Sequence, residues 1–308
     1  DPGFMATVPF VLRNVVGGLN STPLLAIPLF ILGGIIMAQS GIAKRLFDVF
    51  AYLIGDKTGG MPCASIITCL FYGAISGSAP ATTAAVGTMT IPVLDDMGYD
   101  HAFNASTVAI AGGLGVIIPP SIPFIVYSMA SGASVGDMFL AGVIPGILIA
   151  LCLMIYAVYY CKTKGEDKER IRNRVAVLRE KGFLGVLKSS FWALLSPIII
   201  LGGIYGGIVT PTEAALIGVF YAALVGLFIY RTLRPKDLIL LCVEAVKTTA
   251  PMLLVIGAAS AFSRVLSLMQ ASEVVFSLAD GLLENRIVLL FVLNLFLLFM
   301  GMIIDTSP

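Results

Sequence analysis

Residues 73–83 read Gly-Ala-Ile-Ser-Gly-Ser-Ala-Pro-Ala-Thr-Thr, a run of small and hydroxylated residues inside an otherwise apolar stretch of chain. A second interruption, Gly-Val-Ile-Ile-Pro-Pro-Ser, occupies residues 115–121. Non-helical backbone at membrane depth is tolerated only where protein buries it or where it lines a cavity. Paired interruptions of apolar segments are the best sequence indication of a binding site in a secondary transporter. The two interruptions therefore predict a ligand site built from broken membrane segments.

The composition is that of a membrane protein. The 308 residues are 58% hydrophobic and 12% charged, and their mean hydropathy is +0.99. A soluble domain carries about 25% charged residues. The apolar segments have the length of helices and not of the roughly 10-residue alternating strands of a membrane barrel. We therefore expect an all-α polytopic protein in a lipid bilayer, and the lack of a basic patch with interleaved aromatic residues predicts no nucleic-acid partner.

Segment lengths predict which parts of the chain cross the bilayer, because a spanning helix needs about 20 mostly apolar residues. Segments 60–78 and 80–94 are short and meet at the first interruption, which predicts a re-entrant hairpin. Segment 101–130 should be a broken helix, because the prolines at 119 and 120 remove two amide donors. The remaining apolar segments predict spans at 23–39, 137–161, 190–210, 212–230 and 248–269, interfacial helices at 42–55, 236–246 and 272–283, and the first arm of a second hairpin at 285–304.

Positive charge predicts the orientation. Residues 161–188 hold nine of the 19 Lys and Arg residues, and short basic loops stay in the cytoplasm. Counting crossings outward from this basic loop leaves only Arg13, Arg264 and Arg286 outside. On the same count, segment 23–39 runs inward and segment 248–269 runs outward.

The two halves of the chain also match at a fixed offset of 228 residues without a gap. Together with the opposite directions of the matched spans, this offset predicts an inverted repeat, which is the architecture of many secondary transporters. The matched pairs are Pro23 and Pro251, Gly73 and Gly301, Ile75 and Ile303, Ser78 and Thr306, and Pro80 and Pro308.

These patterns predict four regions. They are a first inverted repeat at 1–160, with its re-entrant hairpin at about 60–94 and its broken helix at about 101–130; a basic cytoplasmic loop at 161–188; a scaffold helix pair at 189–235; and the start of a second inverted repeat at 236–308, truncated at the second hairpin.

The first interruption offers oxygen ligands without charge. Ser76, Ser78, Thr82 and Thr83 supply hydroxyl groups, and Pro80 suits the first turn of a returning helix. Oxygen-only surroundings suit a hard cation, whereas the N-terminus of the outgoing helix offers amides to an anion. Small residues also serve close helix packing, but a packing face would space them four apart, and here they are contiguous. We therefore predict a binding site.

Three further features of the sequence also carry predictions. The glycines before Pro119 and Pro120 indicate an unwound, ion-contacting stretch, because an ordinary kink needs only one proline. Thr210 and Glu213, three residues apart, predict a capping box and not an ion site. Asp305 either faces a cation or substrate or caps the next helix.

Six stretches of the chain resemble one family, and together they run through essentially its whole length. The Pro-Pro-Ser-Ile and Pro-Thr-Glu-Ala motifs are the most specific of them. The chain resembles the large membrane subunit of the tripartite ATP-independent periplasmic (TRAP) transporters. The stretches are residues 24–34, 41–46, 73–78, 113–122, 139–146 and 210–214.

The resemblance implies an elevator-type fold of the ion-transporter superfamily, with two inverted repeats that each carry a re-entrant helical hairpin. It also implies sodium-driven import of organic acid anions, such as C4-dicarboxylates, sialic acid or related sugar acids, with sodium as coupling ion and no cofactor. The implied partners are a small four-helix membrane subunit and a periplasmic substrate-binding protein, in the inner membrane of a bacterium or archaeon.

The resemblance also implies roles for individual residues. Pro80 departs from the family pattern, which often has a small residue there, and we expect the chain to be truncated at both ends. The implied sodium site comprises Ser76, Gly77, Ser78, Gly115, Pro119 and Ser121. The implied substrate site comprises Thr82, Thr83, Asp305 and Thr306.

Other functions remain to be weighed against this one. A stand-alone sodium- or proton-coupled anion symporter of the same architecture would differ by not needing a binding protein. A membrane-embedded hydrolase using Ser76 or Ser78 would need a nearby base, but His101 is the only histidine and lies in a turn motif. A non-transporting scaffold could bind lipid headgroups or a partner through its basic loop, but it gives no reason for the paired breaks. We therefore expect a transporter and not an enzyme.

Overall fold

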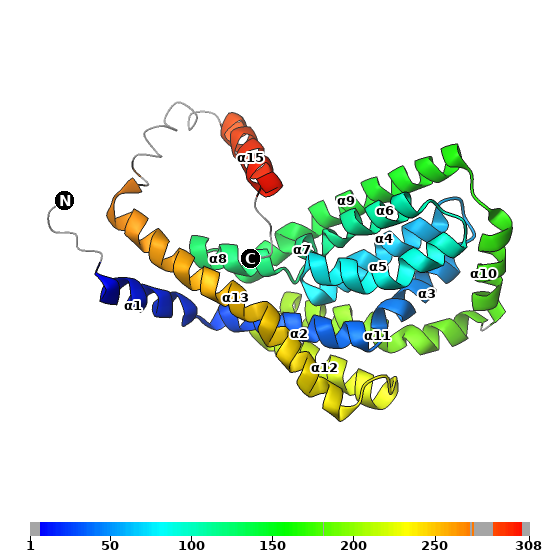
Figure 1. The fold of residues 1–308 in the computed structure, drawn as a ribbon, viewed down its shortest axis with the longest axis horizontal. Coiled ribbons are helices and arrows are strands. Elements are labelled where there is room, and N and C mark those ends of the chain that lie inside the picture. The colour runs from blue at the N-terminus through cyan, green and yellow to red at the C-terminus, as the bar shows by residue number, and fades with distance from the viewer. Residues whose placement is uncertain (1–6, 181, 272, 274–285, 304–308) are drawn as a thin grey trace. The chain divides into compact units, whose positions relative to one another are not determined.

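The computed structural model describes residues 7–180, 182–271, 273 and 286–303, and all regular structure in these ranges is helical (Figure 1). The helices are α1 (Val8–Leu19), η1 (Thr22–Leu25), α2 (Ala26–Gln39), α3 (Ile42–Ile54), α4 (Gly60–Ser76), α5 (Ala79–Asp96), α6 (His101–Gly112), α7 (Leu114–Ile117), α8 (Ile122–Ser131), α9 (Val135–Lys164), α10 (Lys168–Glu180), α11 (Gly182–Tyr205), α12 (Pro211–Leu224), the π-helix η2 (Val225–Ile229), α13 (Pro235–Leu268) and α15 (Arg286–Ile303).

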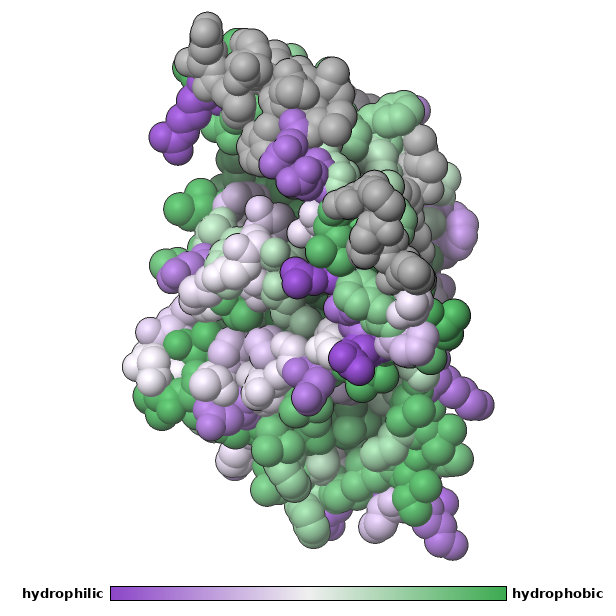
Figure 2. Space-filling model, turned by 90° about the vertical axis from the view of Figure 1, so that its left-hand side faces the viewer, coloured by the Kyte–Doolittle hydropathy of each residue, from purple (hydrophilic) through white to green (hydrophobic). Residues whose placement is uncertain are grey.

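Six helical segments in the described part are long and apolar enough to cross a membrane. Large apolar side chains lie on their surfaces: Ile144 and Ile155 of α9, for example, are 78% and 69% exposed. The face shown in Figure 2 likewise carries broad areas of hydrophobic side chains. Exposed apolar surface on this scale indicates a membrane or partner environment. The prediction of an all-α polytopic membrane protein is confirmed to this extent: the described part is helical and contains six candidate membrane spans. The candidate spans are residues 22–39, 101–131, 135–164, 182–205, 211–229 and 235–268.

The chain divides into two compact units, residues 22–246 and residues 1–21 together with 247–308. The larger unit is built around α4, because 14 of the 17 residues of this helix are buried. Helix α4 contacts α2, α3, α5, α6, α7, α9 and α11. Small residues permit this crowding: a Cβ atom on Gly73 would lie 2.7 Å from the Cα atom of Gly115. The first hairpin arm is therefore the core of its unit.

The basic segment 161–188 is not a loop throughout, because it contains α10. Ile171, Val175 and Leu178 of this helix recur every three or four residues and are buried. They join one apolar cluster with Phe47 of α3 and Leu94 of α5. An apolar stripe of this spacing is typical of a surface helix that packs on a core. The loop prediction missed the helix because its charged residues outweigh the narrow stripe.

Another predicted boundary also differs from the structure. Segments 236–246 and 248–269 form the single helix α13, because Lys and Glu lower the hydropathy between them but are good helix formers. The first arm predicted at 285–304 corresponds to α15. The interfacial helix predicted at 272–283 lies, apart from residue 273, outside the described residues. The capping box at Thr210 and Glu213 is confirmed at the start of α12.

Candidate functional site

Helices α4 and α5 are joined by only two residues, Gly77 and Ser78. Gly77 adopts a left-handed conformation (φ 62°, ψ 12°), and its amide donates to the carbonyl oxygen of Gly73 at 3.0 Å. Such a residue ends a helix at least steric cost when it is glycine. Ser78 is extended and precedes α5, whose first turn contains Pro80. The sequence therefore folds here into a tight helical tip.

Hydroxyl groups cross-connect this tip. The Oγ1 of Thr82 donates to the carbonyl oxygen of Ser78 at 2.8 Å, and the Oγ of Ser76 lies 2.9 Å from the same Thr82 Oγ1. Either hydroxyl can be the donor in the second bond, and the Oγ of Ser76 also lies 3.4 Å from the carbonyl oxygen of Ser78. Both side chains are at most 1% exposed. The tip therefore holds a buried cluster of neutral oxygen atoms.

The second interruption lies between α7 and α8, where residues 118–121 are not helical. Ser121 connects its two sides, because its Oγ donates to the carbonyl oxygen of Val116 at 2.6 Å and accepts from the amide of Phe124 at 3.4 Å. Ser121 is thus the N-cap of α8. It is fully buried.

The two interruptions meet. The amide of Ile122 donates to the carbonyl oxygen of Gly77 at 3.4 Å. A Cβ atom on Gly77 would lie 2.8 Å from the carbonyl oxygen of Pro120, and one on Gly115 would lie 2.8 Å from that of Ser78. Backbone therefore packs directly on backbone, which only glycine allows at these two positions.

The structure brings together most of the residues that the sequence analysis selected. Thr83 lies beside the tip cluster, next to Gly112 of α6. Asp305 and Thr306 lie outside the described residues. The residues that meet where the two interruptions join are Ser76, Gly77, Ser78, Thr82, Gly115 and Ser121, and Pro119 belongs to the same non-helical stretch as Ser121.

Helix ends supply the electrostatics of this site. Residues 58–94 contain no charged side chain. The last carbonyl groups of α4 have no amide ahead of them in the helix, and the first amides of α5 and α8 have no carbonyl behind them. These ends carry partial negative and partial positive charge respectively. The arrangement can hold a cation on carbonyl and hydroxyl oxygens, and an anion on amides.

A second polar cluster closes the opposite end of the hairpin. The Oε1 of Glu166 accepts from the amide of Gly59, before α4, at 2.9 Å and from the hydroxyl of Tyr99, after α5, at 2.5 Å. Burial and the neighbouring Glu166 carboxylate raise the pKa of Tyr99. Arg179 of α10 pairs with Asp56 at 2.7 Å. Sequence reasoning missed this cluster because Glu166 and Gly59 are 107 residues apart.

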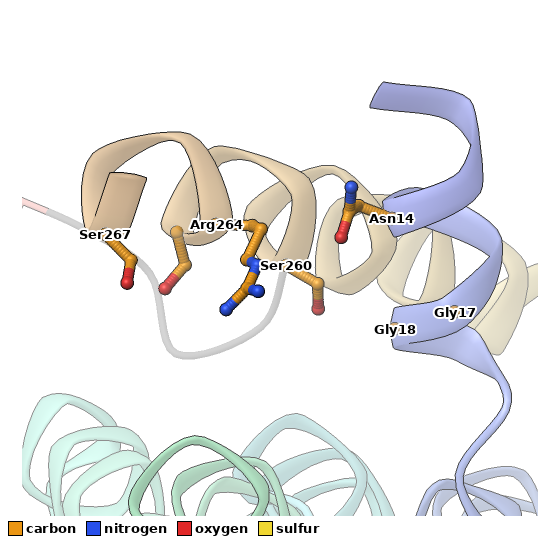
Figure 3. Close-up of a pocket in the computed structure, with 7 residues that line it drawn as sticks. Asn14, Gly17, Gly18, Ser260, Arg264 and Ser267 are labelled. Carbon is orange, nitrogen blue, oxygen red and sulfur yellow. The ribbon is translucent and has the colours of Figure 1, made fainter. Parts of the chain in front are cut away.

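A separate groove lies within the unit formed by residues 1–21 and 247–308. Its volume is about 340 Å³. Ser260, Arg264 and Ser267 project from α13, and Asn14 comes from α1 (Figure 3). The groove contains none of the residues selected from the sequence. It is lined by Asn14, Gly17, Gly18, Ser260, Ser263, Arg264 and Ser267.

Comparison with known sequences assigns the chain to a family. Residues 4–308 match the family described as Tripartite ATP-independent periplasmic transporter, DctM component. The chain belongs to this family. The resemblance noted from the sequence is thereby confirmed, and the chain is a multi-pass component of a transporter and not an enzyme.

Individual members of the DctM family are also similar. The chain is 39% identical over 294 residues to the isethionate TRAP transporter permease protein DctMQ of Oleidesulfovibrio alaskensis, covering 96% of this chain and 46% of that protein. It is 40% identical over 284 residues to the C4-dicarboxylate TRAP transporter large permease protein DctM of Pseudomonas aeruginosa, covering 92% and 65%. It is 33% identical over 299 residues to the sialic acid TRAP transporter large permease protein SiaM of Vibrio cholerae, covering 97% and 69%. The chain thus spans about half to two thirds of the length of these relatives.

Proposed function

We propose that this chain is part of the large membrane subunit of a TRAP importer that couples inward movement of sodium to uptake of an organic acid anion. The observation that carries the proposal is the meeting of the two helix interruptions, where the Gly77 carbonyl oxygen accepts from the Ile122 amide. Unwound backbone at membrane depth has a function when it lines a binding site. Half-helix ends are used for ions and anionic substrates in secondary transporters.

Sodium would bind at the end of α4, where the last carbonyl groups of the helix carry partial negative charge. Ser76, Ser78 and Ser121 supply hydroxyl or carbonyl oxygens, and Gly77 and Gly115 supply backbone close to the hairpin tip. We include Pro119 on the resemblance. The lack of charged residues at 58–94 fits a monovalent cation held by neutral oxygens. Bound sodium would draw the hairpin tip and the broken helix together, because it would share oxygens from both.

The organic anion would bind beside the sodium ion. The first amides of α5 and α8 attract negative charge, and the hydroxyls of Thr82 and Thr83 are close to the start of α5. We extend the substrate site to Asp305 and Thr306 on the resemblance alone. Sodium would increase anion affinity, because its charge offsets repulsion between the anion and nearby carbonyl oxygens.

An inverted-repeat, elevator-type architecture is supported by the helix bounds. Shifted by 228 residues, α1 (8–19) falls on 236–247 and α2 (26–39) on 254–267, both within α13. Shifted likewise, α4 (60–76) falls on 288–304, close to α15 at 286–303. We propose that the loaded hairpin and broken helix move against a scaffold that includes residues 189–235, with the basic segment 161–188 in the cytoplasm of a bacterial or archaeal cell.

The names of the relatives support the substrate class. Isethionate, C4-dicarboxylates and sialic acid are all organic anions, and each appears in the name of a protein to which this chain is at least 33% identical. The proposed partners are a small four-helix membrane subunit and a periplasmic substrate-binding protein, as the word tripartite in the family description suggests.

Reconstituted transport tests this proposal. The full-length protein, its small subunit and its binding protein would be placed in proteoliposomes, and uptake of labelled organic anions would be followed under an inward sodium or potassium gradient. Uptake that requires both sodium and the binding protein is the expected result. Uptake that is indifferent to sodium would contradict the proposal. Uptake without the binding protein would favour the stand-alone symporter.

A further inference from the structure

Helix α10 connects two membrane segments at one surface of the bilayer. Candidate spans end at Lys164 in α9 and begin at Gly182 in α11. The intervening residues are too few and too charged to cross the bilayer themselves, since a crossing needs about 20 mostly apolar residues. Helix α10 therefore stays on one side of the bilayer, and both of its ends lead directly into candidate spans.

A cleft separates α10 from the end of α5. Its volume is about 360 Å³. One part of its lining is apolar, and the other part carries two arginines and one aspartate. Val177, which borders the cleft, is 54% exposed. The lining residues are Val93, Asp96, Met97, Arg170, Asn173, Arg174 and Val177.

The two arginines of the cleft differ in their partners. Arg170 pairs through its Nε with Asp167 at 3.0 Å and reaches the carbonyl oxygen of Asp96 at 3.5 Å. Arg174 makes no hydrogen bond or ion pair within the described part of the chain. A guanidinium group has five N–H donors in a geometry that matches phosphate. The guanidinium donors of Arg174 therefore have no protein acceptor among the described residues and can take up an oxyanion.

We propose that this cleft binds the headgroup of an anionic phospholipid. The phosphate group would lie on Arg174 with support from Arg170, and the Asp96 carboxylate would accept from headgroup hydroxyls such as those of phosphatidylglycerol. The apolar side chains of Val93 and Val177 would contact the glycerol backbone and the start of the acyl chains. Basic pockets at membrane surfaces bind anionic headgroups in this way. A free phosphate ion would leave the apolar half of the cleft unused.

The site would act on the hairpin through α10. This helix packs on α3 and α5 through Ile171, Val175 and Leu178. A lipid that bridges α10 and α5 would therefore hold the base of the hairpin closed. The expected consequence is a more stable protein in anionic bilayers, which is measurable without any transport.

The test uses the full-length protein in nanodiscs of phosphatidylcholine with increasing fractions of phosphatidylglycerol. Thermal unfolding and retention of phosphatidylglycerol in native mass spectrometry would be compared for wild type, Arg174→Gln and Arg172→Gln. Arg172 is an exposed arginine of the same helix that does not line the cleft, so its variant controls for surface charge. In detergent without lipid, both variants should unfold at the wild-type temperature.

Phosphatidylglycerol should stabilise wild type and Arg172→Gln, and Arg174→Gln should bind it at least about tenfold more weakly, as expected for loss of a charged hydrogen bond. Arg174→Lys should restore part of the effect, because it keeps the charge but not the two-pronged geometry. Equal losses in Arg172→Gln and Arg174→Gln would overturn the proposal. So would equal stabilisation by phosphatidylethanolamine, or by inorganic phosphate in pure phosphatidylcholine.

Discussion

The carbonyl oxygen of Gly77 lies 3.4 Å from the amide nitrogen of Ile122, which places the tip of the hairpin against the first turn of α8. This hydrogen bond joins the connection between α4 and α5 to the non-helical stretch before α8, although the two are far apart in the chain. Each interruption alone would leave polar backbone to be satisfied. Their meeting makes one polar junction within an apolar unit.

Gly77→Ala should destabilise the protein and impair transport. A left-handed conformation costs a residue with a Cβ atom about 1–2 kcal/mol, and this Cβ atom would also press on the Pro120 carbonyl oxygen at 2.8 Å. Gly132→Ala is the matched control, because Gly132 is also left-handed (φ 73°) but has open space around its Cβ position. Unfolding in detergent should show the larger loss for Gly77→Ala. Equal losses would mean that contact between the interruptions contributes nothing.

Thr82→Val should weaken sodium coupling. The change removes the hydroxyl that bonds to Ser76 and Ser78 and leaves a side chain of similar shape. An unmade buried hydrogen bond costs about 1–3 kcal/mol, so the sodium concentration for half-maximal uptake should rise roughly 5- to 150-fold. Thr88→Val is the control, since the Thr88 hydroxyl bonds only to carbonyls of its own helix. Thr82 itself is assigned to the substrate site, so the effect on sodium would come from the loss of its bonds to Ser76 and Ser78. Unchanged sodium dependence in Thr82→Val would show that these bonds do not hold the sodium-binding residues in place.

Glu166→Ala should loosen the base of the hairpin. It leaves the Gly59 amide and the Tyr99 hydroxyl without their acceptor, at a cost of about 2–4 kcal/mol. Glu166→Gln keeps a carbonyl oxygen, so its loss of unfolding free energy should be about half that of Glu166→Ala or less. Glu169→Ala, on the exposed face of α10, should be close to neutral. Chemical unfolding of the three variants measures their free energies of unfolding. A Glu166→Ala variant as stable as wild type would show that Glu166 does not hold the base of the hairpin together.

The ion pair of Asp56 and Arg179 should add a small, pH-dependent stability. Arg179 lowers the pKa of Asp56 below its ordinary value of 3.8. A carboxyl group whose pKa is lower in the folded state contributes stability above its unfolded pKa and loses it as the pH falls through its folded pKa. Both side chains are more than 40% exposed, so the contribution should be below about 1 kcal/mol.

Arg179→Gln measures that contribution. The variant should unfold slightly earlier than wild type at neutral pH, and the difference should vanish on acidification below the folded pKa of Asp56. Arg172→Gln serves as the control for a change in overall charge. A difference that persists unchanged at low pH would show that Arg179 stabilises the protein by packing and not by its charge.

Local signals in the sequence predicted the parts of the fold that depend on local chemistry. The hairpin tip could be predicted from the contiguous small residues around Gly77, and the broken helix from Pro119 and Pro120. The capping box could be predicted from Thr210 and Glu213, because their spacing alone determines the hydrogen bonds. Such features need no knowledge of distant residues.

Contacts between distant segments could not be predicted in this way. In the sequence, Glu166 is one of many charged residues in its segment. Only the fold brings it to Gly59 and Tyr99. Helix α10 was missed because Ile171, Val175 and Leu178 form a stripe too narrow to offset the surrounding charge. The bond between Gly77 and Ile122 was likewise invisible, although both interruptions were recognised.

Hydrogen–deuterium exchange of the full-length protein would show whether sodium binds where the two interruptions meet. Exchange would be measured in sodium and in potassium at equal ionic strength, for wild type and for Thr82→Val. We expect sodium, and not potassium, to slow exchange of amides at residues 76–83 and 114–122 together in wild type. At the same sodium concentration, the slowing should be smaller in Thr82→Val. Equal exchange in the two salts, or protection confined to other parts of the chain, would contradict binding of sodium at this junction.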